Sequence, residues 1–84
     1  MHFTHKNRGT CSTKVEFDMG EDHIIRNVSY QNGCSGNLQG ISKLAEGMKA
    51  EDYIERCKNI KCGSKPTSCP AQLSEALEEA ILQI

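Results

Sequence analysis

The chain has 84 residues and a formal net charge of −1 at pH 7, a size that supports one domain, residues 1–84, with a single small core. So weak a charge creates no field that would attract nucleic acid or an anionic membrane, and we expect neither as a partner. The N-terminus lacks the apolar segment of a secretory signal, and no apolar run is long enough to span a membrane, so a soluble, cytoplasmic protein is expected.

Three segments in the first half of the chain are predicted to form an antiparallel sheet: residues 1–6, 10–19 and 23–30. The second alternates most clearly, with Val15, Phe17 and Met19 on one face and charged residues on the other. Such alternation is typical of a strand with one buried face. Ile24 and Ile25 interrupt the alternation of the third segment, which predicts a bulge near this pair.

Three helices are predicted to follow the sheet. The first begins near residues 34–37, carries an apolar stripe that includes Leu44, and ends near Gly47. The second spans about residues 50–58, and Cys57 on its apolar side is expected to pack in the core. The third begins near Ser68 or Cys69, with Pro70 in its first turn. Its apolar stripe places the thiol of Cys69 on the face that points towards the sheet, together with Leu73, Ala76, Leu77, Ala80 and Ile81. The predicted fold class is therefore α+β, a small three-stranded antiparallel sheet followed by about three helices packed on one face.

The five cysteines are the most informative feature of the composition. In a chain without a secretory signal they favour reduced thiols, which bind metal or carry out redox chemistry, over a disulfide framework. Cys11 extends the inward face of its predicted strand, so we expect it to point towards the core side, either as a small buried hydrophobe or as a ligand at the rim of the sheet. Cys34 and Cys69 are placed at helix starts, where unpaired backbone N–H groups stabilise a thiolate, and Cys62 lies in a loop.

All four of these cysteines fall in loops or at the ends of elements, so we expect Cys11, Cys34, Cys62 and Cys69 to converge on one site. Soft thiolate ligands select zinc, iron or an iron–sulfur cluster over magnesium or calcium. The spacing does not distinguish zinc from a cluster. Lys61 and Lys65 would offset part of the negative charge of four thiolates.

The motifs around these cysteines resemble the stand-alone TSCPD-domain proteins, whose domain also occurs at the C-terminus of adenosylcobalamin-dependent ribonucleotide reductases. The matching segments cover most of the chain: Gly9-Thr10-Cys11, residues 33–41, Cys62-Gly63 and Thr67-Ser68-Cys69-Pro70. The resemblance implies metal binding, a link to deoxynucleotide synthesis and a reductase or another redox protein as partner. The family's signature aspartate is Ala71 here. A chain of 84 residues is too small for ribonucleotide reductase chemistry alone.

A more distant similarity concerns the NifU/IscU-type iron–sulfur scaffolds, in which a cysteine on a strand, one at a helix start and one opening the last helix occur in the same order. The similarity implies that Cys11, Cys34 and Cys69 are the scaffold thiols. The scaffold's histidine corresponds to Ser68, and its aspartate is absent. Cys62 would then replace those ligands.

Three functions follow from these observations. The first is a metal-binding accessory module with Cys11, Cys34, Cys62 and Cys69 as ligands, or a cluster scaffold that uses the same thiols. The second is a thiol redox carrier in which Cys62 and Cys69 exchange electrons with a reductase. The third is a small α+β protein whose cysteines are buried and whose interaction surface is not marked in the sequence.

Overall fold

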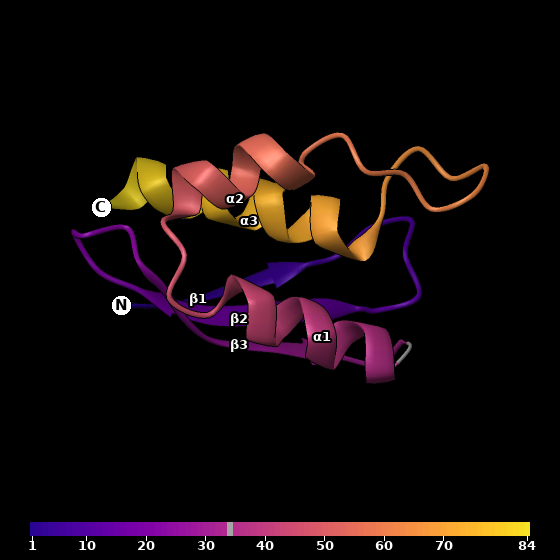
Figure 1. The fold of residues 1–84 in the computed structure, drawn as a ribbon, viewed down its shortest axis with the longest axis horizontal. Helices are drawn as coiled ribbons and strands as arrows, with labels where there is room; N and C mark the ends of the chain where they lie inside the picture. The colour runs from indigo at the N-terminus through magenta and orange to yellow at the C-terminus, as the bar shows by residue number, and fades with distance from the viewer. Residues whose placement is uncertain (34) are drawn as a thin grey trace.

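The computed structural model describes residues 1–33 and 35–84, and within them three strands precede three helices. The strands are β1 (His2–Lys6), β2 (Lys14–Met19) and β3 (Ile25–Gln31), and the helices are α1 (Ser35–Ala45), α2 (Ala50–Cys57) and α3 (Cys69–Gln83). The strands form an antiparallel sheet in the order β1-β2-β3 (Figure 1). The predicted α+β class and order of elements are confirmed.

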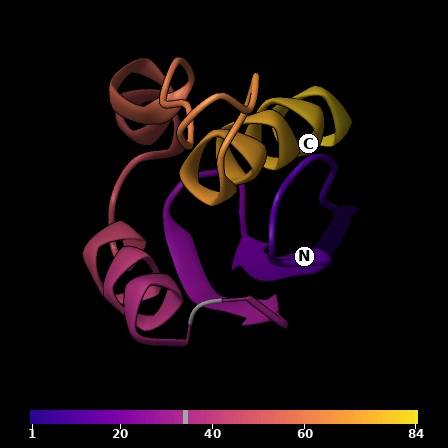
Figure 2. The same cartoon turned by 90° about the vertical axis from the view of Figure 1, so that its right-hand side faces the viewer.

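The core lies between one face of the sheet and the helices. Val15, Phe17 and Met19 of the central strand are buried on this face, as their alternation predicts. Leu73 and Leu77 of α3 pack against them in the same apolar cluster. Figure 2 shows α3 above the sheet, α2 beside α3, and α1 alongside β3. Burial of these apolar side chains is the main force that holds the layers together.

The bulge in the sheet lies slightly further along the chain than the Ile24–Ile25 pair. Glu16 pairs with Ser29 and Asp18 with Arg26, so β3 has one more residue than β2 between these pairs. Asn27 takes a φ of 57° in this interval, a conformation that asparagine adopts more readily than most residues. The extra residue explains how both Ile25 and Val28, three positions apart, can face the core.

The position of Cys11 differs from the sequence expectation. Strand β2 begins at Lys14, and Cys11 is exposed, whereas the neighbouring Ser12 is 1% exposed. The alternation does not extend to residue 11 because the preceding residues form a loop. Gly9 has a φ of 69°, and the Asn7 N–H donates across the loop to the Thr13 carbonyl at 2.9 Å.

The helices follow the predicted limits closely, with one exception in their packing. Gly47 has a φ of 82° just after α1, as expected of a glycine that ends a helix. The prediction that Leu44 belongs to the buried stripe is wrong, because its side chain is 79% exposed, whereas Ala45, which the same stripe includes, is buried in the core. Cys57 is partly buried against the core cluster, as expected.

Candidate functional site

The first turn of α3 is the rigid part of the candidate site. Ser68 caps this helix: its hydroxyl oxygen accepts a hydrogen bond from the Ala71 N–H at 3.2 Å and its proton is donated to the Ile60 carbonyl at 2.7 Å. Such a cap satisfies one of the N–H groups that a helix start leaves unpaired. It also fixes the next residue, Cys69, whose side chain is buried at 8% exposure, in agreement with the sequence expectation.

Two of the predicted site cysteines meet at this turn. The sulfur of Cys11 lies 3.9 Å from the sulfur of Cys69, although the two residues are 58 positions apart in the chain. Cys11 comes from the loop between β1 and β2, so this contact joins the sheet to α3. One sulfur of the pair is buried and the other is exposed at the surface.

Cys62 lies near this pair without contacting Cys69 among the described contacts. Its loop is closed by backbone hydrogen bonds from the Cys62 N–H to the Thr67 carbonyl at 3.1 Å and from the Lys65 N–H to the Cys62 carbonyl at 3.0 Å. Cys11, Cys62 and Cys69 all line one cavity of about 480 Å³, which also includes Gly36 near the start of α1. Three of the four cysteines that were predicted to converge therefore line the same cavity.

The fourth predicted ligand, Cys34, lies outside the described residues. Its neighbour Gly33 is in contact with the β1–β2 loop, since a Cβ at this glycine would lie 3.0 Å from the backbone nitrogen of Ser12. Among residues 1–33 and 35–84, no group of three or more histidine, cysteine, aspartate or glutamate side chains is close enough together to hold a metal ion.

Polar side chains are buried around this end of the molecule. The buried polar residues of the described chain are Asn7, Ser12, Ser68, Gln72 and Ser74. Gln72 accepts from the Arg8 N–H at 3.1 Å and donates to the Thr67 hydroxyl at 3.1 Å, which ties α3 to both neighbouring loops. Burying polar groups is costly unless they are hydrogen-bonded. These side chains therefore hold the loops and the start of α3 in a defined arrangement.

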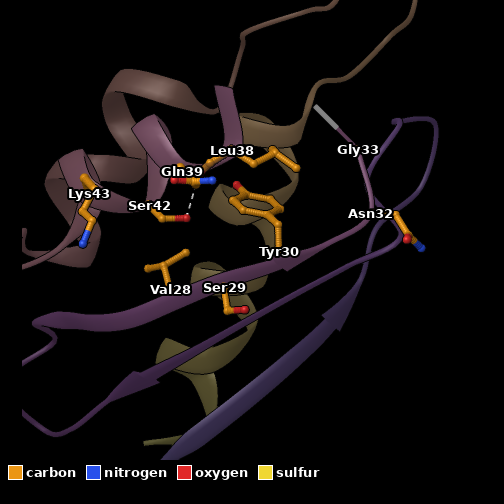
Figure 3. Close-up of a pocket in the computed structure, with 9 residues that line it drawn as sticks. All are labelled: Val28, Ser29, Tyr30, Asn32, Gly33, Leu38, Gln39, Ser42 and Lys43. Carbon is orange, nitrogen blue, oxygen red and sulfur yellow. Dashed lines mark hydrogen bonds between the residues drawn. The ribbon is translucent and has the colours of Figure 1, made fainter. Parts of the chain in front are cut away.

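Two tyrosines support the same turn from below. The Tyr30 hydroxyl donates to the Cys69 carbonyl at 3.0 Å, and the Tyr53 hydroxyl donates to the Pro70 carbonyl at 3.0 Å. Burial raises the pKa of both phenols well above the ordinary value, so both remain donors throughout the physiological pH range. In Figure 3, Tyr30 rises from β3 towards Leu38 of α1, in a second cavity of about 530 Å³ between these elements.

Sequence reasoning missed the polar and aromatic residues that position Cys69. Asn7 and Ser12 lie in a loop whose conformation has no periodicity, and the tyrosines appear in the sequence only as core residues. The one available signal was the adjacency of Ser12 to Cys11 and of Ser68 to Cys69.

Comparison with known proteins identifies the family of this chain. The family model of the TSCPD domain matches residues 2–81, nearly the whole chain. The chain belongs to the TSCPD-domain family. Searches of curated proteins and of solved structures found no match, so the similarity of this TSCPD domain to NifU/IscU scaffolds stays a prediction.

Two further observations concern the TSCPD domain as described. Ala71 is 4% exposed and supplies its N–H to the Ser68 cap. In the part of the chain that the structure describes, no helix combines the length and the apolar character needed to cross a membrane.

Proposed function

We propose that this TSCPD domain is a metal-binding accessory module in which Cys11, Cys34, Cys62 and Cys69 hold zinc or an iron–sulfur cluster. The observation that carries the proposal is the distance of 3.9 Å between the sulfurs of Cys11 and Cys69. Two thiolates bound to one tetrahedral metal at about 2.3 Å lie about 3.8 Å apart. The pair therefore already has the separation that two ligands of one metal require.

The remaining ligands come from two other positions in the chain. Cys62 is exposed on a short loop that lines the same cavity, and Cys34 precedes α1. Because no three described ligands are grouped, metal binding requires the Cys62 loop to move towards the pair. Metal binding of this kind is coupled to local folding, since the ligands are brought together only when the metal is present.

The donor set limits the choice of metal. Thiolates favour zinc and iron over magnesium or calcium. A site with four thiolates carries a large negative charge, and Lys61, which lines the cavity, would offset part of it. A closed set of four cysteines is typical of a structural zinc site, and the same four ligands also hold iron–sulfur clusters.

The proposal is tested by metal analysis of protein purified without oxygen under reducing conditions. We expect stoichiometric zinc, or iron with sulfide, in the parent chain. Each single cysteine-to-serine replacement at a proposed ligand should lower the metal content, because a hydroxyl is a poor ligand for these metals. The four positions are Cys11, Cys34, Cys62 and Cys69.

Cys57 supplies the matched control, because it is the cysteine that packs partly against the core and is not a proposed ligand. Cys57→Ser should retain the metal of the parent. A parent chain that contains no metal and takes up neither zinc nor iron under these conditions would rule the proposal out.

From the resemblance to the TSCPD-domain proteins we further propose a ribonucleotide reductase or another redox protein as the partner of this module. Co-sedimentation of the purified chain with a ribonucleotide reductase from the same organism would test this link. A complex that forms with the metal-loaded chain and weakens after Cys69→Ser is expected. Independent sedimentation of the two proteins at concentrations of tens of micromolar would contradict it.

The same 3.9 Å contact favours a second candidate function, a thiol redox carrier. In this case the pair would be Cys11 and Cys69, in place of the Cys62 and Cys69 pair considered from the sequence. The two thiols would lose two electrons and two protons to an oxidant such as hydrogen peroxide, which is reduced to water, as the S–S bond forms. A reversible mass loss of two hydrogens, abolished by Cys11→Ser in metal-free protein, would distinguish this function from metal binding.

A further inference from the structure

Ser12 contacts the buried sulfur of the candidate site from the β1–β2 loop. Its side chain is 1% exposed and its hydroxyl oxygen lies 2.9 Å from the sulfur of Cys69. Either group could donate the proton in an isolated pair. The direction of this hydrogen bond is therefore decided by the other partners of Ser12.

The neighbouring groups leave the Ser12 proton for the sulfur. A hydroxyl has one proton to donate and two lone pairs that accept. The Asn7 amide NH₂ donates to the Ser12 hydroxyl oxygen at 2.8 Å. The Thr10 hydroxyl donates to the Ser12 backbone carbonyl at 2.8 Å, and its distance to the Ser12 hydroxyl is longer, 3.4 Å. Cys69 is thus the nearest acceptor for the Ser12 proton.

The direction of this hydrogen bond depends on the orientation of the Asn7 amide. Asn7 is 8% exposed, and among the described residues its side-chain oxygen has no hydrogen-bond partner. Either orientation of the amide leaves one buried polar atom without a partner, at about 1–3 kcal/mol, so this cost does not decide between them. Turned the other way, the amide oxygen would accept from Ser12 and take the proton away from Cys69. The observed orientation is the one that leaves the Ser12 proton to the sulfur.

We propose that Ser12 is a positioning residue for Cys69: its hydroxyl donates to the sulfur, Asn7 fixes the direction of that hydrogen bond, and together they hold the sulfur facing Cys11. A metal-bound thiolate has no proton and can only accept, so the same hydrogen bond persists when metal binds. The effect on metal rests on the proposed metal-binding function. The hydrogen bond itself is a property of the metal-free chain and is measured separately.

The test compares Ser12→Ala with Ser74→Ala. Ser74 is also fully buried, and its hydroxyl donates to the Pro70 carbonyl at 3.3 Å, away from the sulfur. Both variants lose one buried hydroxyl of the same size, so a general loss of stability affects both. Only Ser12→Ala removes a donor from Cys69.

Two readouts separate this inference from the function on which it builds. In the metal-free reduced chain, the Hα–Hβ coupling constants of Cys69 report whether its side chain stays in one rotamer. In the chain loaded with cobalt(II), the sulfur-to-metal charge-transfer absorption and the rate of cobalt loss to a chelator report the bound sulfur. Loss of a hydrogen bond to a metal ligand typically lowers metal affinity about 10- to 100-fold.

We expect averaged Cys69 couplings in Ser12→Ala, a shifted charge-transfer band and cobalt loss at least about 10-fold faster than in the parent. Ser74→Ala should match the parent in all three measurements. If Ser12→Ala and Ser74→Ala behave alike, the positioning role is wrong. If the parent binds no cobalt, the proposed function fails, and the couplings alone decide the role of Ser12.

Asn7→Asp provides a second variant that keeps Ser12 in place. A carboxylate of nearly the same shape can only accept, so it should take the Ser12 proton and reproduce the effect of Ser12→Ala on the Cys69 couplings. Unchanged couplings in a folded Asn7→Asp chain would overturn the role assigned to Asn7, even if Ser12→Ala does not fold.

Discussion

His2 lies between two carboxylates on the solvent face of the sheet. Its Nδ1 is 2.7 Å from Asp18 and its Nε2 is 3.4 Å from Glu16, both on the neighbouring strand β2. Hydrogen bonds to Asp18 and then Glu16 raise the pKa of His2. The pKa of Glu16 is lowered chiefly by His2, and that of Asp18 by Asn27 and then His2.

The pH dependence of this cluster follows from the direction of each shift. The contribution of His2 to stability is fully present below its unfolded pKa of about 6.5 and is lost as the pH rises through its raised folded value. The contribution of the carboxylates is present above about pH 4.5 and is lost as the pH falls through their lowered folded values. The cluster therefore stabilises the sheet most between about pH 4.5 and 6.5.

We expect the difference in melting temperature between the parent and His2→Gln to be largest near about pH 5.5 and to decrease as the pH rises through the raised pKa of His2. The effect should be modest and decrease at high salt, because all three side chains are at least partly accessible to solvent. His23→Gln tests a histidine in another exposed pair, with Glu51. A difference for His2→Gln that stays constant from pH 5 to pH 9 would contradict the assignment.

Two glycines in and before helix α1 have opposite environments. Gly33 has a φ of 96°, and a Cβ there would lie 2.9 Å from Leu38 and 3.0 Å from the Ser12 backbone. Gly40 lies within the helix, and a Cβ there would meet nothing within 4 Å. Glycine is required at the first position by the close approach of α1 to the β1–β2 loop, whereas at the second it only weakens the helix.

Gly40→Ala is therefore expected to increase the free energy of unfolding by about 1 kcal/mol, since alanine favours the helix. Gly33→Ala should decrease it by about 1–3 kcal/mol because the added methyl group overlaps with neighbouring atoms. Denaturant unfolding of both variants provides the measurement. Equal effects of the two substitutions would show that the loop and α1 do not pack as described.

At the level of elements, the sequence predicted what is periodic. The alternation of Val15, Phe17 and Met19 located β2, and the apolar stripe from Leu73 to Ala80 located the buried face of α3. The same alternation failed when extended back to Cys11, because hydrogen bonds between residues distant in the chain form that loop. One of these runs from the Thr13 N–H to the Gln31 carbonyl at 2.8 Å, and no local pattern encodes it.

At the scale of the whole molecule, large apolar side chains fall into two groups. Leu77 is fully buried in the core, whereas Leu44 is 79% exposed beside the cavity of the candidate site. A domain of this length has a total stability of roughly 4–13 kcal/mol. A single cavity in the core can therefore remove a large part of it.

Leu77→Ala is expected to lower the free energy of unfolding by about 2–5 kcal/mol, through lost burial and the cavity left behind. Leu44→Ala, with the same change in side chain, should alter it by less than about 0.5 kcal/mol. Thermal and denaturant unfolding followed by circular dichroism give both values. A large loss in Leu44→Ala would mean that this side chain is covered in solution.

The candidate site could be predicted only in part. The sequence shows which residues are cysteines, but it does not show how close their sulfurs lie in the folded chain. The location of Cys69 at the start of α3 followed from Pro70 and the apolar stripe of that helix. The contact between Cys11 and Cys69 depends on how the β1–β2 loop folds over α3. That packing, and the role of Ser12 within it, become visible only in three dimensions.

The two tyrosines beneath the first turn of α3 give the molecule a built-in optical reporter. The chain has no tryptophan and two tyrosines, so excitation in the near-ultraviolet band of tyrosine, where phenylalanine hardly absorbs, reports Tyr30 and Tyr53. The Tyr30 hydroxyl is hydrogen-bonded to the Cys69 carbonyl, and the Tyr53 hydroxyl to the Pro70 carbonyl. Any ligand, oxidant or partner that displaces this turn changes the surroundings of both fluorophores at once, so events at the cysteines can be followed without an attached label.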